Sequence, residues 1–419
     1  MAEVGAKVSL NAIGKQDTYL TRDDPNYSLF NYSPKQHSNF SKFHRSTNVT
    51  RPRDKSNWPF GETVKVTFYP KYMGDLLSNM YIHIKFPGVP GGMNLADQLG
   101  RHIIKSLTMR VDDMVVEIFH DDWGIIYDEL YLDSSEKRTK RYTINRNLAE
   151  DTSSLAGNFI LSNFDSELMI PIPMFFSRKY EGDEYATNNP NRPYFPLCAI
   201  HKQKIVFDIE FHEQSFFTDY TTPIQLHSFN IITEEIAVSQ EERTFLMTQR
   251  QLFITDVVKK HPSTDTTRLE LVPDIPVKTL NWFMRDTNTT YNNRFNFSAN
   301  TNYSVVNSYF EPVMDSAKIY IKGEDLPNIP LTKHSFYKYV IPFNSRLSRP
   351  NRNIYTYTFS MNPINVEPSG SLDFGQLQSN KTVLEVKLSQ ELTRNYELHL
   401  YYVGYQTFVF DMGFMSLAY

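Results

Sequence analysis

The feature that most constrains the fold of this chain is a repeated alternation of apolar and polar side chains. In residues 80–86 every second residue is apolar: Met80, Ile82, Ile84 and Phe86. Comparable runs lie at residues 63–70, 204–211, 317–323, 355–361 and 397–405. Successive side chains of a strand point to opposite faces, so the pattern predicts antiparallel strands that bury one face.

Helix signals are few. Ser239 stands three residues before Glu242 in a capping-box pattern, which predicts the start of a short helix. A second helix is predicted over residues 95–107. In residues 119–130 we predict a third helix start, with acidic residues in its first turn and Trp123 packed beneath it. The sequence therefore favours an all-β protein with a few short helices in the connections.

Composition narrows the class of protein. A chain of 419 residues exceeds one typical core and suggests about two to three domains. The 43 basic and 47 acidic residues nearly balance, which argues against a surface built for nucleic acid. The one cysteine, Cys198, excludes an intrachain disulfide and predicts a small buried side chain in a reducing compartment. We expect neither a membrane-spanning helix nor a cleaved leader.

A faint internal repeat suggests two halves joined near residues 217–228. IPMFFSR (172–178) and IPFNSR (341–346) are each followed by PNR and a strand-like run. Earlier in each half an alternating run ends in acids, at 109–113 and 320–325. Matches this short can also arise by chance. If the repeat is real, it indicates two copies of one β-sandwich, and about 200 residues suit an eight-stranded jelly roll.

The chain carries none of the common catalytic or metal-binding patterns. It has no nucleophile elbow, phosphate-binding loop, dinucleotide fingerprint or paired zinc-ligand histidines. His83, on the polar face of a predicted strand, is interpreted as solvated or interfacial. Four acids near Trp123 have no accompanying base or nucleophile, so a helix is favoured over chemistry there: Asp121, Asp122, Asp128 and Glu129. We therefore predict no catalytic, cofactor-binding or metal-binding residue, and no enzyme.

Residues 35–55 form a basic stretch with interleaved aromatic residues. Against the single acid Asp54 stand six basic residues: Lys35, Lys42, Arg45, Arg51, Arg53 and Lys55. Such a stretch could contact phosphates, lipid headgroups or an acidic protein. The alternative that we favour is an extended arm lying on its own subunit or on a neighbour.

Several further segments form an ordered set along the chain. They are NAIGKQDTYLT (11–21), KQHSNF (35–40), VEIFHDDWGIIYDEL (116–130), PYFPLCAIHKQKIVFDIEF (193–211), EEIAVSQEERTFLMTQRQLFI (234–254), PVKTLNWFMRD (276–286), YTYTFSMNPINVEPSGSLDFGQL (355–377) and GFMSLAY (413–419). This set resembles the double jelly-roll major capsid proteins of nucleocytoplasmic large DNA viruses. Any one match is weak, and their order along the chain makes the resemblance strong.

The resemblance implies an all-β fold of two consecutive eight-stranded antiparallel jelly rolls. It implies an N-terminal arm at residues 1–24, a first jelly roll at 25–220 and a second at 221–419. Residues 276–286 are expected to open the second jelly roll. The turn at Pro368–Gly370 is expected to reverse the chain between adjacent strands of that sandwich.

The resemblance also implies a structural capsid protein: a homotrimer that forms a pseudo-hexagonal capsomer of an icosahedral shell. The implied partners are further copies, neighbouring capsomers, minor capsid proteins and the penton. The basic N-terminal arm (residues 1–55) could also meet an inner membrane. No cofactor and no specific nucleic acid are implied. The expected location is the virion, after assembly in the host cytoplasm.

Two alternatives stay open. Departures from the family pattern, such as the reduction of a glycine-rich start to Gly5 and Glu367 in place of glutamine, leave room for a minor or penton capsomer paralogue. A surface protein whose β-sandwich binds glycans or a receptor is the alternative from a different class.

Overall fold

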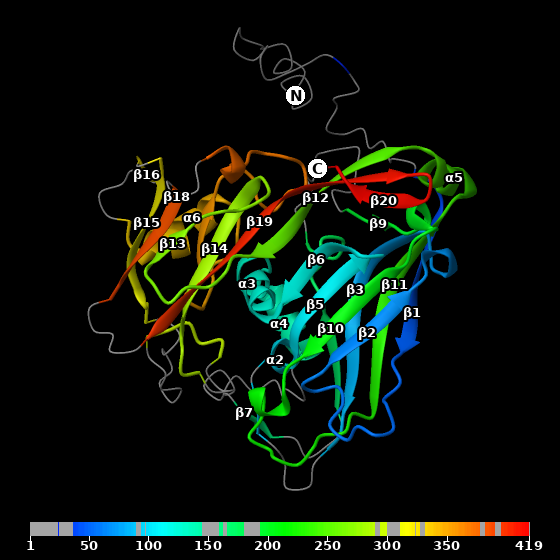
Figure 1. Ribbon diagram of the computed structural model, residues 1–419, viewed down its shortest axis with the longest axis horizontal. Coiled ribbons are helices and arrows are strands. Elements are labelled where there is room, and N and C mark those ends of the chain that lie inside the picture. The colour runs from blue at the N-terminus through cyan, green and yellow to red at the C-terminus, as the bar shows by residue number, and fades with distance from the viewer. Residues whose placement is uncertain are drawn as a thin grey trace, which may run out of the picture. The chain divides into compact units, whose positions relative to one another are not determined.

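Antiparallel strands dominate the computed structural model of the chain (Figure 1). Internal contacts divide the chain into residues 1–39 and residues 40–419, and the strands named below lie in the second part. The structure describes residues 24, 37–88, 94–96, 98–144, 159–161, 166–179, 193–289, 294–299, 311–322, 324–326, 332–377, 382–389 and 395–418. The prediction of an all-β fold with a few short helices is confirmed.

The first sandwich consists of two antiparallel sheets. Across one sheet the strands are β1 (Phe40–Asn48), β11 (Ser228–Val238), β3 (Leu76–Phe86) and β8 (Ser166–Pro171), with β9 (Phe195–Pro196) also paired to β3. Across the other they are β2 (Thr63–Phe68), β10 (Ile205–Phe211), β5 (Ile104–Val111) and β6 (Met114–His120). A small extra sheet pairs β4 (Asn94–Ala96) with β7 (Phe159–Leu161). The rings of Phe211 and Phe229 meet at 5.5 Å between centroids, so the two main sheets share a core.

The second sandwich is built in the same way. One sheet has the order β12 (Gln251–Lys260), β19 (Tyr396–Asp411), β14 (Val277–Asp286) and β17 (Tyr355–Thr358), with β20 (Phe414–Leu417) also paired to β19. The other has the order β13 (Arg268–Glu270), β18 (Thr382–Leu388), β15 (Met314–Ile321) and β16 (Glu324–Leu326). Trp282 packs 5.0 Å from Tyr337, whose hydroxyl donates to the carbonyl of Ala317, so these sheets also share a core.

The strand order is the same in both sandwiches. The eight principal described strands are β1, β2, β3, β5, β6, β8, β10 and β11 in the first sandwich, and β12 to β19 in the second. When each set is numbered along the chain, the first strand pairs with the eighth, the eighth with the third, and the third with the sixth. In the opposite sheet the second pairs with the seventh, the seventh with the fourth, and the fourth with the fifth. Two such four-stranded sheets make a jelly roll. The predicted pair of consecutive eight-stranded jelly rolls is therefore confirmed.

The alternating pattern of the sequence becomes the alternation of burial in the strands. Met80, Ile82, Ile84 and Phe86 of β3 are at most 1% exposed, as predicted. Strand β14 differs because all ten of its residues are buried. One face of β14 covers the core of the second sandwich, and its other face lies against the first sandwich. This second buried face carries the charged residues described below.

The internal repeat is confirmed only in part. Residues 109–113 and the described residues of 320–325 both lie where the fourth strand gives way to the fifth, and Asp112 and Lys322 there have positive φ, at 53° and 52°. The other match is wrong. Residues 172–178 follow the sixth strand of the first sandwich, whereas residues 341–346 precede the sixth strand of the second. Residues 190–192, the first PNR, lie outside the described residues.

The chain passes between the sandwiches later than the sequence suggested. The two halves were expected to join near residues 217–228, but β11 follows this stretch and still pairs with β1 and β3. Its buried Phe229 and Ile231 complete the first core. Helix α5 (Gln240–Thr248) then leads into β12. Residues 276–286 form the third strand of the second jelly roll and do not open it. The domain limits 1–24, 25–220 and 221–419 stay predictions.

The helices are short and lie in connections between strands. They are α2 (Leu99–Ile103), α3 (Asp121–Leu130), α4 (Ser134–Ile144), α5, the π-helical η8 (Phe336–Val340) and α6 (Ile341–Asn344). The predicted capping box is confirmed, because Ser239 Oγ accepts the N–H of Glu242 at 3.3 Å. The predicted helix 95–107 is mostly wrong. Of the described residues in this range only 99–103 are helical, since Leu107 and Met109 alternate into the core as part of β5.

No helix in the described part of the chain has the length and apolar character needed to span a bilayer. Cys198 is 4% exposed, which confirms a small buried side chain, and burial raises the pKa of its thiol to about 11. The thiol is therefore protonated at neutral pH and is a poor nucleophile.

The turn at residues 368–370 has the expected glycine but a different role. Gly370 has a φ of +117°, and a Cβ atom there would lie 3.1 Å from the carbonyl oxygen of Phe359. The carbonyl of Ser369 accepts the N–H of Met361 at 3.0 Å, which folds the loop back on itself. The strands before and after it, β17 and β18, belong to opposite sheets. The turn therefore lies in a crossing between sheets, and it does not join adjacent strands.

The basic stretch at residues 35–55 lies partly in a strand. β1 forms the edge of its sheet and pairs with β11 along its whole length. Arg45 donates to both carboxylate oxygens of the fully buried Glu235, at 2.9 and 3.2 Å, and Lys42 lies 2.8 Å from Glu234. For residues 40–48 the favoured interpretation, a segment lying on its own subunit, is confirmed.

Candidate functional site: the buried contact between the two sandwiches

Helix α3 lies between the two sandwiches (Figure 1). It follows β6 directly, and all ten of its residues are buried although four of them are acidic. Trp123 is 1% exposed and packs against the rings of Tyr131 and Tyr401, at 5.9 and 6.3 Å between centroids. The predicted helix with Trp123 beneath it is confirmed. Because buried carboxylates are costly without partners, each one needs a compensating group.

At the N-terminal end of α3, Asp122 joins the first sandwich to the second. Arg285 of β14 forms a buried ion pair with its carboxylate, and the hydroxyl of Tyr401 on β19 donates to it at 3.3 Å. Burial alone would raise the pKa of Asp122, but the guanidinium groups of Arg285 and Arg294 outweigh burial and hold that pKa well below its usual range. This carboxylate is therefore ionised at neutral pH.

The neighbouring Asp121 makes a second link at the same helix end. Its Oδ2 atom lies 3.0 Å from Nε2 of His212, which follows β10, and 3.7 Å from the guanidinium of Arg294. Its Oδ1 atom accepts the N–H of Asp122 at 2.7 Å. Both acids at the start of α3 are thus occupied by partners from other segments, and both sandwiches contribute such partners.

The C-terminal end of α3 repeats this arrangement. Glu129 lies 3.4 Å from Nε of Arg352 and accepts the N–H of Asn351 at 2.8 Å. The carbonyl of Leu130 accepts the N–H of Ser348 at 2.7 Å. These three partners belong to the segment before β17 of the second sandwich. Helix α3 is therefore fixed to the second sandwich at both of its ends.

Strand β6 supplies another buried acid to the same contact. Glu117 lies 2.6 Å from Arg178, and it accepts the N–H of Val258 on β12 at 3.0 Å. Arg178 in turn donates to the carbonyl of Asp256 on β12 at 2.5 Å. Burial raises the pKa of Glu117 against the opposing effect of Arg178. The first and second sandwiches are thus joined by main-chain as well as side-chain hydrogen bonds.

An apolar cluster completes the contact. Phe175 of the first sandwich lies 5.7 Å from Phe408 of β19, and Phe195 of β9 lies 6.1 Å from Phe410 of β19, between ring centroids. Phe253 of β12 lies 6.4 Å from Phe175. Aromatic pairs at these distances add to the free energy gained from burial. Figure 1 shows β12 and β19 reaching from the second sandwich toward β9 of the first.

Two further histidines, besides His212, lie buried in this region. His102 of α2 packs 4.4 Å from Phe295, and His399 of β19 stacks 5.0 Å from Phe283. Burial lowers the pKa of His102 to about 3, and burial with the nearby Arg285 lowers the pKa of His399 to about 3. Both rings are therefore neutral at physiological pH.

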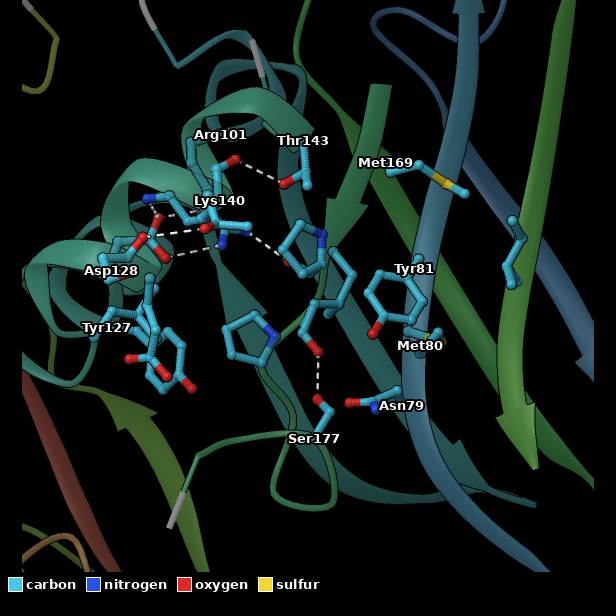
Figure 2. A pocket seen from close by; sticks show the side chains of 18 of the residues that line it. Asn79, Met80, Tyr81, Arg101, Tyr127, Asp128, Lys140, Thr143, Met169 and Ser177 are labelled. Atoms are coloured by element: carbon cyan, nitrogen blue, oxygen red, sulfur yellow. Dashed lines mark hydrogen bonds and ion pairs between the residues drawn. The ribbon is translucent and has the colours of Figure 1, made fainter. Parts of the chain in front are cut away.

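A surface pocket of about 550 Å³ opens between α3, α4, β3 and β8 (Figure 2). Figure 2 shows Arg101 and Lys140 converging on Asp128 at one wall, with ion-pair distances of 2.9 and 2.5 Å. The opposite wall carries Tyr81 and Met169. Two cations meet one carboxylate at this wall, so all three charged groups are engaged in ion pairs.

The acids noted in the sequence therefore lie on one helix and are satisfied by ion pairs. Among the described residues no group of three or more His, Cys, Asp and Glu side chains is placed to hold a metal ion. His83 is partly exposed and lies 3.5 Å from Glu167 on the outer face of the first sandwich. Sequence reasoning missed the basic partners, such as Arg285 and Arg178. The available signal was a basic residue near each end of β14, on either side of its apolar segment Trp282–Met284.

We predict that Arg285→Met strongly destabilises the chain. The change leaves the Asp122 carboxylate buried without its main partner, and breaking a buried pair typically costs about 3–5 kcal/mol. Lys105→Met is the control, because Lys105 and Glu210 form an exposed pair whose loss should cost about 1 kcal/mol or less. Urea unfolding at fixed protein concentration measures both, and equal effects would contradict the prediction.

We also predict that stability falls as the pH drops from about 6.5 toward 5. His102 and His399 stay neutral in the folded chain, whereas in the unfolded chain they take up protons below their ordinary pKa of 6.5. Unfolding therefore binds extra protons, and each histidine lowers the free energy of unfolding by about 1.4 kcal/mol per pH unit in this range. The variant His399→Phe keeps an aromatic ring at this position but cannot take up a proton. It should therefore reduce the slope of unfolding free energy against pH by about 1.4 kcal/mol per pH unit. An unchanged slope in urea titrations would contradict the assignment.

Two family patterns match the sequence. The family described as large eukaryotic DNA virus major capsid protein matches residues 234–408, and that described as major capsid protein N-terminus matches residues 28–243. Together the two matches cover both sandwiches in chain order.

Relatives and solved structures agree with these patterns. The major capsid protein of Paramecium bursaria Chlorella virus 1 is 21% identical, over 91% of this chain and 87% of its own length. That of Pyramimonas orientalis virus is 22% identical, over 66% of this chain and 64% of its own length. The crystal structure of VP54 from the Chlorella virus (PBCV-1) superposes with a TM-score of 0.73 at 16% identity, covering 94% of this chain and 100% of that one.

A second solved structure of a major capsid protein has a similar fold. The Faustovirus major capsid protein superposes with a TM-score of 0.65 at 12% identity, covering 97% of this chain and 98% of that one. At such identities the structures bear on the fold alone, and that fold is the one described above. The sequence patterns bear on the family, which is one of structural proteins and not of enzymes. The chain therefore belongs to the major capsid proteins of large eukaryotic DNA viruses.

Proposed function

We propose that three copies of this chain form one pseudo-hexagonal capsomer of an icosahedral shell. The observation that carries this proposal is the identical strand order of the two sandwiches. A closed three-fold ring repeats one set of contacts, and two similar sandwiches per chain then give six similar sides. Such an object tiles a lattice in which each capsomer has six neighbours. The buried contact through α3 supports the proposal, because the six sides keep their angles only if each pair of sandwiches is rigid.

Exposed apolar side chains provide surfaces through which the copies of the proposed trimer could contact one another. In the second sandwich Phe343 of α6 is 83% exposed, with Val340 and Tyr339 of η8 beside it in the chain. On β12, Leu252 is 68% exposed. Exposed apolar groups of this size commonly mark protein interfaces, which are enriched in aromatic residues. Assembly in the host cytoplasm is part of the proposal, and a single buried cysteine suits that reducing compartment.

The proposed trimer can be tested by measuring the mass of the particle in solution. Purified full-length chain should scatter light as a particle of three times the 49.0 kDa chain mass. Obligate interfaces commonly bury more than about 2,000 Å², so the trimer should persist at micromolar concentration. Native mass spectrometry provides an independent measurement. A well-folded monomer at that concentration would overturn the proposal.

We further propose that the basic stretch of the N-terminal arm (residues 1–55) meets an inner membrane or minor capsid proteins at the capsid interior. Support comes from its basic side chains on either side of β1, which include Lys35 before the strand and Arg51 and Arg53 after it. The variant that tests this proposal lacks residues 1–36, carries Arg51→Gln and Arg53→Gln, and keeps β1, whose Arg45 pairs with the buried Glu235. The truncated chain should still form trimers, because β1 stays in its sheet, but it should assemble poorly into shells. Normal shells seen by electron microscopy would refute this role.

A further inference from the structure

Exposed aromatic and basic side chains from three loops meet at one end of the first sandwich. The loops are η3 (Pro70–Tyr72) with the residue before it, residues 201–204 before β10, and the hairpin between β19 and β20. We call this the aromatic–lysine surface, and it consists of Tyr69, Lys71, Tyr72, Lys202, Met412 and Phe414. The four apolar or aromatic members are 52%, 68%, 70% and 51% exposed in chain order. Both sandwiches contribute, because the hairpin belongs to the second.

Hydrogen bonds hold residues 201–204 to the hairpin between β19 and β20. The N–H of Lys202 donates to the carbonyl of Gly413 at 3.3 Å, and the N–H of Met415 donates to Oε1 of Gln203 at 2.6 Å. Asp112, in the turn between β5 and β6, accepts from the N–H of Lys204 and from the amide of Gln203, both at 3.1 Å. Residues 201–204 and the hairpin are therefore held in place, which lowers the entropy cost of binding a partner there.

A hollow of about 360 Å³ opens in this surface, between Tyr69, Lys71, His201, Lys202 and Lys204. Within the described part of the chain, none of its three lysines has a carboxylate partner at ion-pair distance. The carboxylate of Asp112, which also lines the hollow, is already bonded to the two N–H donors named above.

Two of the lysines lie against aromatic rings. Nζ of Lys71 is 4.7 Å from the ring centroid of Tyr72, and Nζ of Lys202 is 5.2 Å from that of Phe414. A cation over a ring is attracted weakly at exposed sites and keeps its charge available to a second partner. The hollow is thus positively charged and is flanked by apolar groups.

We propose that the aromatic–lysine surface binds an acidic peptide segment of another protein, one that alternates carboxylates with large apolar side chains. Carboxylates would enter the hollow and neutralise Lys71, Lys202 and Lys204, while apolar side chains would cover Tyr72 and Phe414. A recessed polar hollow admits single side chains, whereas a flat bilayer would meet only the projecting rings. The geometry therefore favours a peptide over a membrane. The proposal does not depend on the trimer.

The test uses the full-length chain and a fluorescein-labelled peptide of alternating glutamate and leucine. Fluorescence anisotropy should show binding that weakens with salt, and the triple variant Lys71→Glu, Lys202→Glu, Lys204→Glu should lose about tenfold or more in affinity. The control reverses three exposed lysines elsewhere, Lys65, Lys333 and Lys387, and should bind as the unchanged chain does. Tyr72→Ala with Phe414→Ala should weaken binding without changing its salt dependence.

Three outcomes would overturn the proposal. The first is no binding of the acidic peptide, and the second is an equal loss of affinity in the triple variant and its control. The third is binding to phosphatidylserine vesicles but not to the peptide, which would identify a membrane site. Light scattering of the triple variant separates this inference from the capsomer, because its oligomeric mass should equal that of the unchanged chain.

Discussion

The buried contact of α3 is the constraint on which the rest of this structure depends. A helix with four carboxylates lies fully buried between two sandwiches, and that position is tolerable only if the other segments bring cations to it. Arg285 on the inner strand of the second sandwich meets Asp122, and Arg352 meets Glu129. The second sandwich can therefore occupy only the position that places both arginines at the two ends of one helix.

The apolar residues of this contact stabilise it, whereas its ion pairs determine the orientation of the two sandwiches. The phenylalanine cluster around Phe175 and Phe408 supplies burial of apolar area, which is favourable in many relative orientations. The ion pairs contribute less net free energy, because desolvation offsets much of their attraction. Their geometry, however, is directional, and a small rotation of one sandwich would leave a buried charge unpaired. We infer that the pairs fix the angle between the sandwiches, and the proposed capsomer with six similar sides would need a fixed angle.

The sequence predicted what depends on local pattern and missed what depends on distant partners. Alternation located β3, and the spacing of Ser239 and Glu242 located the start of α5, because a few neighbouring residues decide both. The helix expected over residues 95–107 failed where pairing with β10 outweighed helical spacing. Nothing local to Asp122 identifies Arg285, which is far away in the chain. The one usable signal was a basic residue next to the apolar run Trp282–Met284 of β14, and its partner could be identified only from the fold.

The shared topology of the two sandwiches does not make them interchangeable. The first contributes buried acids to their contact, from β6 and α3, whereas Arg285 and Arg352 come from the second. The hairpin between β19 and β20 likewise exists only in the second sandwich, and it lies on the loops of the first. A sandwich of one kind therefore cannot replace the other in this contact. In a closed ring of three chains the two kinds must alternate, so six similar sides would still present two different surfaces in turn. The lysine-lined hollow occurs once per chain, so a ring of three chains would carry three copies of it.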